Sequence, residues 1–197
     1  MGEPWSGSTD EQLLEATASG EEEAFVEIYR RYHEQVYRFA YHMTGFAAAA
    51  EDVTHTSFAS LLESPRRFRP GRAGLGTYLC AAARNQNLKR LRQARLEVLY
   101  AKPAADARTE GGPLQSLLAE ELAHAVRDAV LRLAPLHREV VILFELEGMD
   151  LASVAEIVGA DVGTVKVRLH RARMKLRQWL ESYVTSGARA TSFDRRR

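Results

Sequence analysis

Residues 150–177 read Asp150-Leu-Ala-Ser-Val-Ala-Glu-Ile-Val-Gly159-Ala-Asp161-Val-Gly-Thr-Val-Lys-Val-Arg-Leu-His-Arg-Ala-Arg-Met-Lys-Leu-Arg177. This pattern predicts a short helix, a tight turn at Gly159 and then a long basic helix. Two helices joined by a short turn that contains glycine form a helix-turn-helix, whose second helix enters a DNA groove. We therefore expect this stretch to form a DNA-binding unit.

The second of these helices has an apolar face and a basic face. Its apolar positions recur at three- and four-residue steps and should pack on the preceding helix: Val162, Val165, Leu169, Ala172 and Leu176. Gly163, Val167, His170, Arg171 and Met174 then point the opposite way. The bases along the helix face only one acid, Asp161, which can cap the first turn. A solvated basic helix is the alternative, but so little intrahelical pairing favours DNA contact.

Charge is distributed unevenly over the 197 residues, although the formal net charge is only +1. The stretch from Met1 to Tyr29 has acids and no Lys or Arg, whereas Arg84 to Leu96 has five bases and no acids. Such asymmetry indicates two faces with different partners.

One cysteine, Cys80, is present, so no internal disulfide can form, which fits a reducing cytosol. We expect it to be a small buried thiol. The acidic N-terminus does not resemble a signal peptide, and no apolar run approaches the roughly 18 residues that a membrane span needs. We therefore expect a cytoplasmic protein without membrane insertion.

Strand signals are nearly absent, so the expected fold class is all-α, with two helical domains joined by a flexible linker. A capping box at Thr9–Gln12 should open the first helix, and Gly45 should end the second. Proline, glycine and small polar residues over 100–113 are typical of a linker. The expected helices cover about 21–44, 47–63, 75–99, 114–133 and 136–146. The expected divisions are a first domain over 10–99, a linker over 100–113, a helix-turn-helix domain over 114–184 and a frayed tail over 185–197.

Several runs match a known family in order along the chain: Glu51-Asp-Val53 with Phe58, Phe68-Arg-Pro-Gly-Arg72, Ala83-Arg-Asn85, Leu133-Ala-Pro-Leu-His-Arg-Glu-Val-Val-Ile-Leu143 and Gly163-Thr-Val-Lys-Val-Arg-Leu-His-Arg-Ala-Arg-Met-Lys-Leu176. They resemble the extracytoplasmic-function (ECF) sigma factors of bacterial RNA polymerase, over about residues 10–184. The resemblance implies a sigma factor without enzymatic activity or cofactor, which binds core RNA polymerase and directs promoter recognition, melting and transcription initiation. It also implies promoter DNA and an anti-sigma protein as partners.

The resemblance assigns roles to the matching positions. Contacts to the minus-35 duplex are expected from Thr164, Lys166, Val167, Arg168, His170 and Arg171. Contacts to the melted minus-10 element are expected from Phe68, Arg69, Arg72, Arg84 and Asn85. Polymerase binding is expected from Asp52, Val53, His55, Thr56 and Phe58. These assignments make physical sense, because a rigid helix suits the major groove, and a basic loop with an aromatic ring suits unstacked bases.

The chain departs from the family pattern at several of these places. His55 and Thr56 stand where a Gln and an acid are usual, Tyr78 where Trp is common, and Lys89 where Asp is common. Because a carboxylate makes stronger, charge-assisted bonds to a basic partner, His55 and Thr56 predict a weak grip on polymerase. Val167 replaces a small polar residue and can make only apolar contact, for instance with a thymine methyl.

Other functions fit parts of the sequence. An enzyme or metal site is disfavoured because the histidines lack metal-ligand spacing: His33, His42, His55, His124, His137 and His170. A helix-turn-helix regulator that never binds polymerase would need a sensor or dimerisation domain in the first half, which the basic run from Arg84 argues against. A degenerate sigma-like protein that serves as a partner-binding module is kept open by His55 and Thr56.

Overall fold

The computed structural model describes residues 5–65, 68, 74–100 and 114–193, and for 94–100, 114–120 and 182–193 it describes only the backbone. Within these ranges every regular element is helical, which confirms the all-α class. The helices are α1 (Asp10–Ala18), α2 (Glu22–Thr44), α3 (Ala47–Glu63), α4 (Leu75–Tyr100), α5 (Leu114–Arg132), α6 (Pro135–Val141), η2 (Ile142–Leu146), α7 (Leu151–Val158) and α8 (Val162–Phe193). The expected DNA-contacting residues Arg69 and Arg72, and linker residues 101–113, lie outside the described residues.

The ends of the first helices follow local rules. Thr9 and Gln12 form the expected capping box, in which the Thr9 side chain accepts from the Gln12 backbone N–H and the Gln12 side chain accepts from the Thr9 backbone N–H. Gly45 ends α2 at φ 80°, a left-handed conformation that favours glycine. Both predictions are confirmed.

The helix-turn-helix also forms as predicted. Asp150 caps α7 by accepting from the backbone N–H groups of Ala152 and Ser153. Gly159 ends α7 at φ 63°, and Asp161 caps α8 by accepting from the Thr164 N–H at 2.8 Å. The short turn between the two caps therefore fixes the direction in which α8 leaves.

Two expectations about helix ends are wrong. The helix expected over 136–146 is α-helical only to Val141 and continues as the π-helical η2, after which the Glu147 N–H donates to the Ile142 carbonyl. The tail expected to fray after Val184 instead continues α8 to Phe193. No proline follows Val184, and extending a helix that has already formed is far easier than nucleating one.

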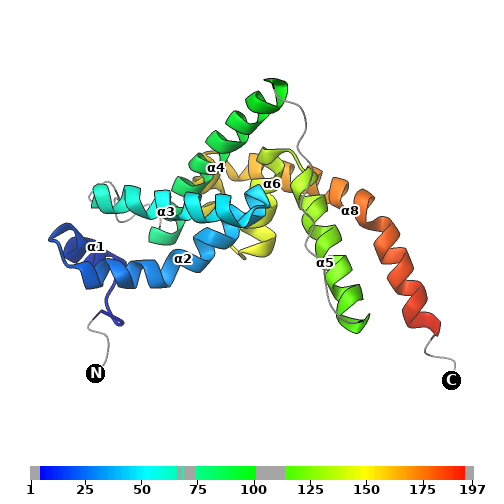
Figure 1. The fold of residues 1–197 in the computed structure, drawn as a ribbon, viewed down its shortest axis with the longest axis horizontal. Helices are drawn as coiled ribbons and strands as arrows, with labels where there is room; N and C mark the ends of the chain where they lie inside the picture. The colour runs from blue at the N-terminus through cyan, green and yellow to red at the C-terminus, as the bar shows by residue number, and fades with distance from the viewer. Residues whose placement is uncertain (1–4, 66–67, 69–73, 101–113, 194–197) are drawn as a thin grey trace.

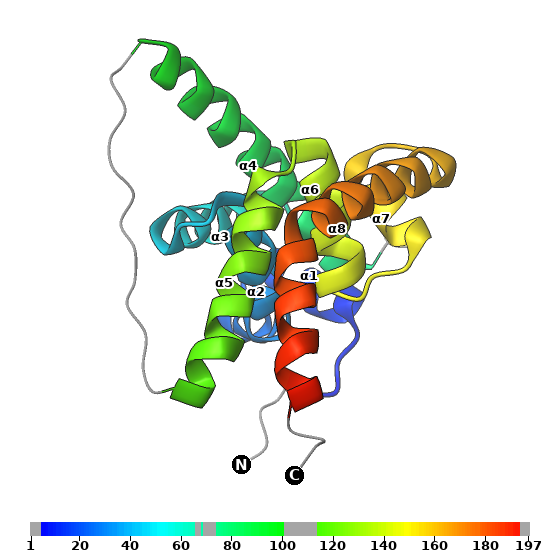
Figure 2. The same ribbon diagram turned by 90° about the vertical axis from the view of Figure 1, so that its right-hand side faces the viewer.

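The helices form two halves that pack against each other. The first half comprises α1–α4 and the second α5–α8; α4 lies against α7, and α2 against α5 and η2 (Figures 1 and 2). We call this contact the seam. The C-terminal end of α4 projects from the body in both views. Among the described helices none is long and apolar enough to span a membrane.

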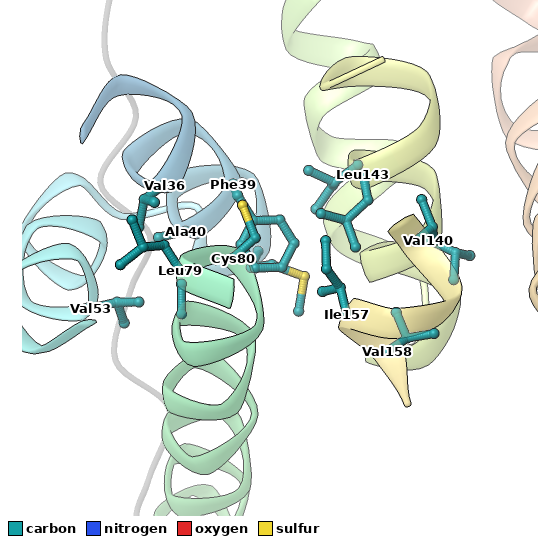
Figure 3. Close-up of a cluster of buried hydrophobic side chains, with 14 of the residues drawn as sticks. Val36, Phe39, Ala40, Val53, Leu79, Cys80, Val140, Leu143, Ile157 and Val158 are labelled. Atoms are coloured by element: carbon teal, nitrogen blue, oxygen red, sulfur yellow. The ribbon is translucent and has the colours of Figure 1, made fainter. Parts of the chain in front are cut away.

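A single hydrophobic core runs across the seam. Phe39 of α2 and Cys80 of α4 face Leu143 of η2 and Ile157 of α7, and all four side chains are buried (Figure 3). Since these side chains belong to one packed cluster, the two halves stabilise each other by burying apolar surface together. The sequence predicted two helical domains but not their contact.

Candidate nucleic-acid interface

The exposed face of α8 presents the predicted recognition residues together. Val165, Leu169 and Ala172 are buried under the helix. The opposite face carries exposed side chains, among them Lys166, Val167, His170, Arg171 and Met174. The predicted division into a packed face and a free face is therefore confirmed. Val167 is 50% exposed, so it offers an apolar surface in the middle of basic side chains.

The other two predicted minus-35 residues are engaged within the protein. The Thr164 hydroxyl donates to the Asp161 carboxylate at 2.7 Å, and this bond is the largest of the causes that lower the pKa of Asp161. Thr164 thus reinforces the start of α8. Arg168 is half-buried, and its guanidinium lies 3.4 Å from a carboxylate oxygen of Glu139 on α6.

The predicted minus-10 residue Arg84 also binds Glu139. Its Nε and Nη2 donate to the two carboxylate oxygens of Glu139 at 2.8 and 3.1 Å. The Glu139 side chain has no exposed surface, and that of Arg84 is only 15% exposed. This is the bidentate geometry that makes an arginine–carboxylate pair strong. Asn85, the next residue of α4, remains exposed.

Burial governs the electrostatics of Glu139. Burial raises the pKa of its carboxyl group, while the hydrogen bonds from Arg84 and the nearby charges of Arg84 and Arg168 lower it. A charge removed from water is stabilised only when partners replace the lost hydration. The two guanidinium groups supply that replacement, one from each half of the molecule.

A second ion pair crosses the seam. Arg38 of α2 donates to the Glu147 carboxylate at 2.9 and 3.4 Å, and the Glu147 side chain is 1% exposed. The Arg138 guanidinium of α6 also donates to the Met43 carbonyl at the end of α2. Among the described residues, polar contacts therefore join the halves through Glu139, Glu147 and Arg138.

Phe68 does not have the position expected of a base-stacking ring. It is buried, and its ring packs edge-on against Tyr78 with centroids 5.6 Å apart. The interpretation of Phe68 as a free DNA-contacting ring is corrected, because an aromatic side chain between basic residues has apolar surface that it can bury against α4.

The polymerase-binding residues predicted on α3 fall into two groups. Asp52, His55 and Thr56 are exposed, whereas Val53 and Phe58 are core residues. Phe58 packs against Tyr29 with ring centroids 4.8 Å apart. The assignment of Val53 and Phe58 to direct polymerase contact is therefore wrong: their side chains hold α3 in place and leave the opposite face of the helix for a partner.

The exposed face of α3 already has internal partners. Asp52 lies 3.2 Å from Arg90 of α4, and the Thr56 hydroxyl donates to the Asp52 backbone carbonyl. Exposed ion pairs contribute little to stability, so Asp52 can exchange Arg90 for an external cation at small cost.

Sequence reasoning missed the acids and cations at the seam. Glu139 and Arg138 precede the apolar run Val140–Leu143, and a charged pair beside such a run is the one signal that could have indicated buried charge. Cys80 is buried as expected, and burial raises the pKa of its thiol to about 12. In the part of the chain that the structure describes, no cluster of His, Cys, Asp or Glu could hold a metal ion.

Comparisons with known proteins match both halves. The Sigma-70 region 2 family model matches residues 28–97, and the Sigma-70 region 4 model matches residues 123–176. The ECF RNA polymerase sigma factor SigM of Mycobacterium tuberculosis is 31% identical over 185 residues, which are 91% of this chain and 88% of SigM. The ECF sigma factor BldN of Streptomyces coelicolor is 32% identical over 163 residues, and this chain spans 62% of its length.

Solved structures share the fold. CnrH, in complex with the cytosolic domain of CnrY, superposes with a TM-score of 0.65 at 24% identity, over 88% of this chain and 97% of CnrH. The sigma factor RpoE, in complex with the anti-sigma factor NepR from Bartonella quintana, superposes with a TM-score of 0.63 at 23% identity, over 80% of this chain and 96% of RpoE.

Proposed function

The chain belongs to the ECF family of RNA polymerase sigma factors, and on that premise we propose that it binds core RNA polymerase and directs promoter recognition, melting and transcription initiation. It acts as a non-enzymatic factor in the cytoplasm. Residues 10–99 serve as the polymerase-binding and promoter-melting domain, residues 100–113 as the linker, and the domain over 114–184 reads the minus-35 element.

The exposed face of α8 is the observation that carries the proposal. Lys166, Val167, His170 and Arg171 stand together on a helix whose start is capped and whose other face is packed. Such a helix is rigid before DNA arrives, which suits readout of base edges in the major groove. The Arg171 guanidinium can donate two hydrogen bonds to a guanine, and Val167 can make an apolar contact with a thymine methyl.

We assign polymerase binding to the exposed face of α3, with Asp52, His55 and Thr56 as its centre. His55 and Thr56 replace a Gln and an acid, so they offer fewer acceptors to a basic partner. The double change His55→Gln with Thr56→Glu should tighten binding to core polymerase, by up to about fivefold if it adds one exposed charge pair. Titration of labelled core enzyme against both proteins tests this, and unchanged affinity would remove these positions from the interface.

An anti-sigma protein is the third proposed partner. Both CnrH and RpoE were solved with partners, and RpoE's partner is an anti-sigma factor. The shared fold supports the same kind of regulation here.

Run-off transcription with core polymerase tests the proposed function. Templates would be promoters selected from a random library by the reconstituted holoenzyme. We expect transcripts that depend on this chain, and their loss with Arg171→Ala. Binding of the purified chain to duplex DNA as a dimer, without transcription by any cognate core enzyme, would instead support the plain helix-turn-helix regulator.

A further inference from the structure

We propose that Glu139 stands in for DNA in the free chain: it holds Arg84 and Arg168 in one buried ion cluster, so that Arg84 cannot bind a melted strand until the two halves separate. We call this cluster the latch. The inference rests on the proposed function and on the roles that the family resemblance implies: Arg84 as a contact to the melted minus-10 element, and Arg168 as a contact to the minus-35 duplex, which we take to be a phosphate contact.

In the latch, the Glu139 carboxylate is surrounded by arginines as a bound anionic ligand would be. Glu139 receives two hydrogen bonds from Arg84 at 2.8 and 3.1 Å, and a third from Arg168 at 3.4 Å. Arg84 comes from the first half, whereas Glu139 and Arg168 come from the second. Two planar guanidinium groups around one pair of oxygens are the arrangement that these groups also make around a phosphate.

The latch cannot persist when Arg84 binds DNA. The five N–H donors of an arginine lie in one fixed plane, and the edge that carries Nε and Nη2 is taken by Glu139. The Arg84 side chain is only 15% exposed, so the remaining edge has little access to a strand. If Arg84 leaves, Glu139 is buried with one weaker partner, which is unfavourable unless water reaches it. Release of Arg84 and opening of the seam are therefore one event.

The recognition face of α8 is not subject to this restriction. Lys166, Val167, His170 and Arg171 remain exposed while the latch is closed. The closed chain can thus meet duplex DNA with its second half, but it cannot hold single-stranded DNA through Arg84.

Arg168 couples duplex binding by the second half to the release of Arg84. If Arg168 turns toward a duplex phosphate, the buried Glu139 keeps only Arg84 as a cationic partner, so the closed state is less well compensated and opening of the seam, which hydrates Glu139, becomes more favourable. Coupling of this kind is reciprocal: a strand bound by Arg84 must favour duplex binding by Arg168 by the same factor.

The matched control lies on the neighbouring turn. Glu145 of η2 pairs with Arg173 of α8, and both belong to the second half. Glu145→Gln therefore changes the net charge by the same amount as Glu139→Gln, but the ion pair that it removes lies within the second half.

The experiment measures the opening and the DNA affinity of the full-length chain. Spin labels are placed through Glu63→Cys on α3 and Gln178→Cys on α8, both exposed, while buried Cys80 stays unlabelled. Electron–electron resonance gives the distance between the labels, and fluorescence anisotropy gives the affinity for a random-sequence single-stranded DNA. We expect Glu139→Gln to lengthen the distance and to tighten binding by about fivefold or more, the lower end of usual coupling between sites. Glu145→Gln should change neither quantity.

Several outcomes would overturn the proposal. These are an unchanged distance in Glu139→Gln, equal tightening by both Gln variants, or a longer distance without tighter binding. If none of the proteins binds DNA, the proposed function fails, and the distances still report whether Glu139 closes the seam. Should Glu139→Gln fail to fold, the distance between the labels is measured in the chain with native Glu139, with and without saturating single-stranded DNA. A distance that stays short when the DNA is bound contradicts the latch.

Discussion

The two helices that we assign to DNA binding differ in what the free chain leaves available. α8 presents Val167, His170 and Arg171 as exposed side chains on one face. α4 presents Asn85 but commits Arg84 to a bidentate bond with Glu139 in the other half. The difference arises because α8 packs on helices of its own half. In contrast, α4 lies in the seam and packs on α7 of the other half.

If these helices bind DNA as proposed, the surface for minus-35 readout is already exposed in the free chain, whereas minus-10 binding through Arg84 depends on the arrangement of the halves. The first property follows from caps and periodicity, and the second from ion pairs and a core shared across the seam.

The largest effect is expected from Phe39→Ala in the shared core. Phe39 is fully buried in the apolar cluster across the seam, and truncation of a buried Phe costs about 3–5 kcal/mol. Because the halves share that core, we expect one calorimetric transition that moves to lower temperature as a whole. Two separate transitions, of which only one moves, would show that the halves are stable independently.

A smaller effect is expected from Arg171→Ala on the exposed face of α8. A good bidentate contact to a base is worth about 1–3 kcal/mol of discrimination, so the preference for matched over scrambled minus-35 duplexes should fall accordingly. Arg177→Ala, an exposed arginine of the same helix outside the matched positions, is the control. Equal loss on both duplexes in Arg171→Ala would place Arg171 on phosphate rather than on a base.

Asp161→Ala tests whether the start of α8 depends on its cap. The carboxylate accepts from the Thr164 N–H at 2.8 Å and from the Thr164 hydroxyl at 2.7 Å. Loss of such a cap costs about 0.5–2 kcal/mol, which chemical denaturation would measure. Asp161→Asn keeps an acceptor and should recover most of the loss; if it does not, charge rather than capping stabilises the turn.

These local features are the ones that sequence reasoning predicted well. Gly45, Gly159 and the capping box at Thr9 act within a few residues of themselves, so their positions in the chain are sufficient. The turn of η2 was missed, because the apolar pattern of the preceding helix continues through it. The burial of Phe68 was missed, because a lone aromatic residue in a basic loop has no periodicity to assign it to a face.

The latch was beyond sequence reasoning for a different reason. Arg84 and Glu139 are 55 residues apart and lie on either side of the linker. No local rule pairs a cation of one domain with an acid of another. Several candidate site residues could thus be named from the sequence, but whether each is free or engaged depends on the seam.

The smallest effect concerns acid stability, through His42 at the seam and His137 within the second half. Burial is the largest cause that lowers the pKa of His42, which faces Glu147, Arg127 and Arg38, and of His137, which faces Lys175, Arg171 and Arg168. A histidine whose folded pKa is lowered stabilises the fold above its unfolded value of 6.5, and this stability is lost as pH falls. The melting temperature should therefore drop between pH of about 7.5 and 5.5. His137→Gln should reduce that drop, and exposed His124→Gln should not.

Chemical modification of arginine by phenylglyoxal tests the central comparison most directly. The free wild-type chain is treated briefly, and the adducts at Arg84 and Arg171 are quantified by peptide mass spectrometry. We expect Arg171 to react readily and Arg84 to be protected, with the protection of Arg84 lost in Glu139→Gln and retained in Glu145→Gln. Equal reactivity of Arg84 and Arg171 in the wild-type chain would contradict the account, because Arg84 would then be free without any opening of the seam.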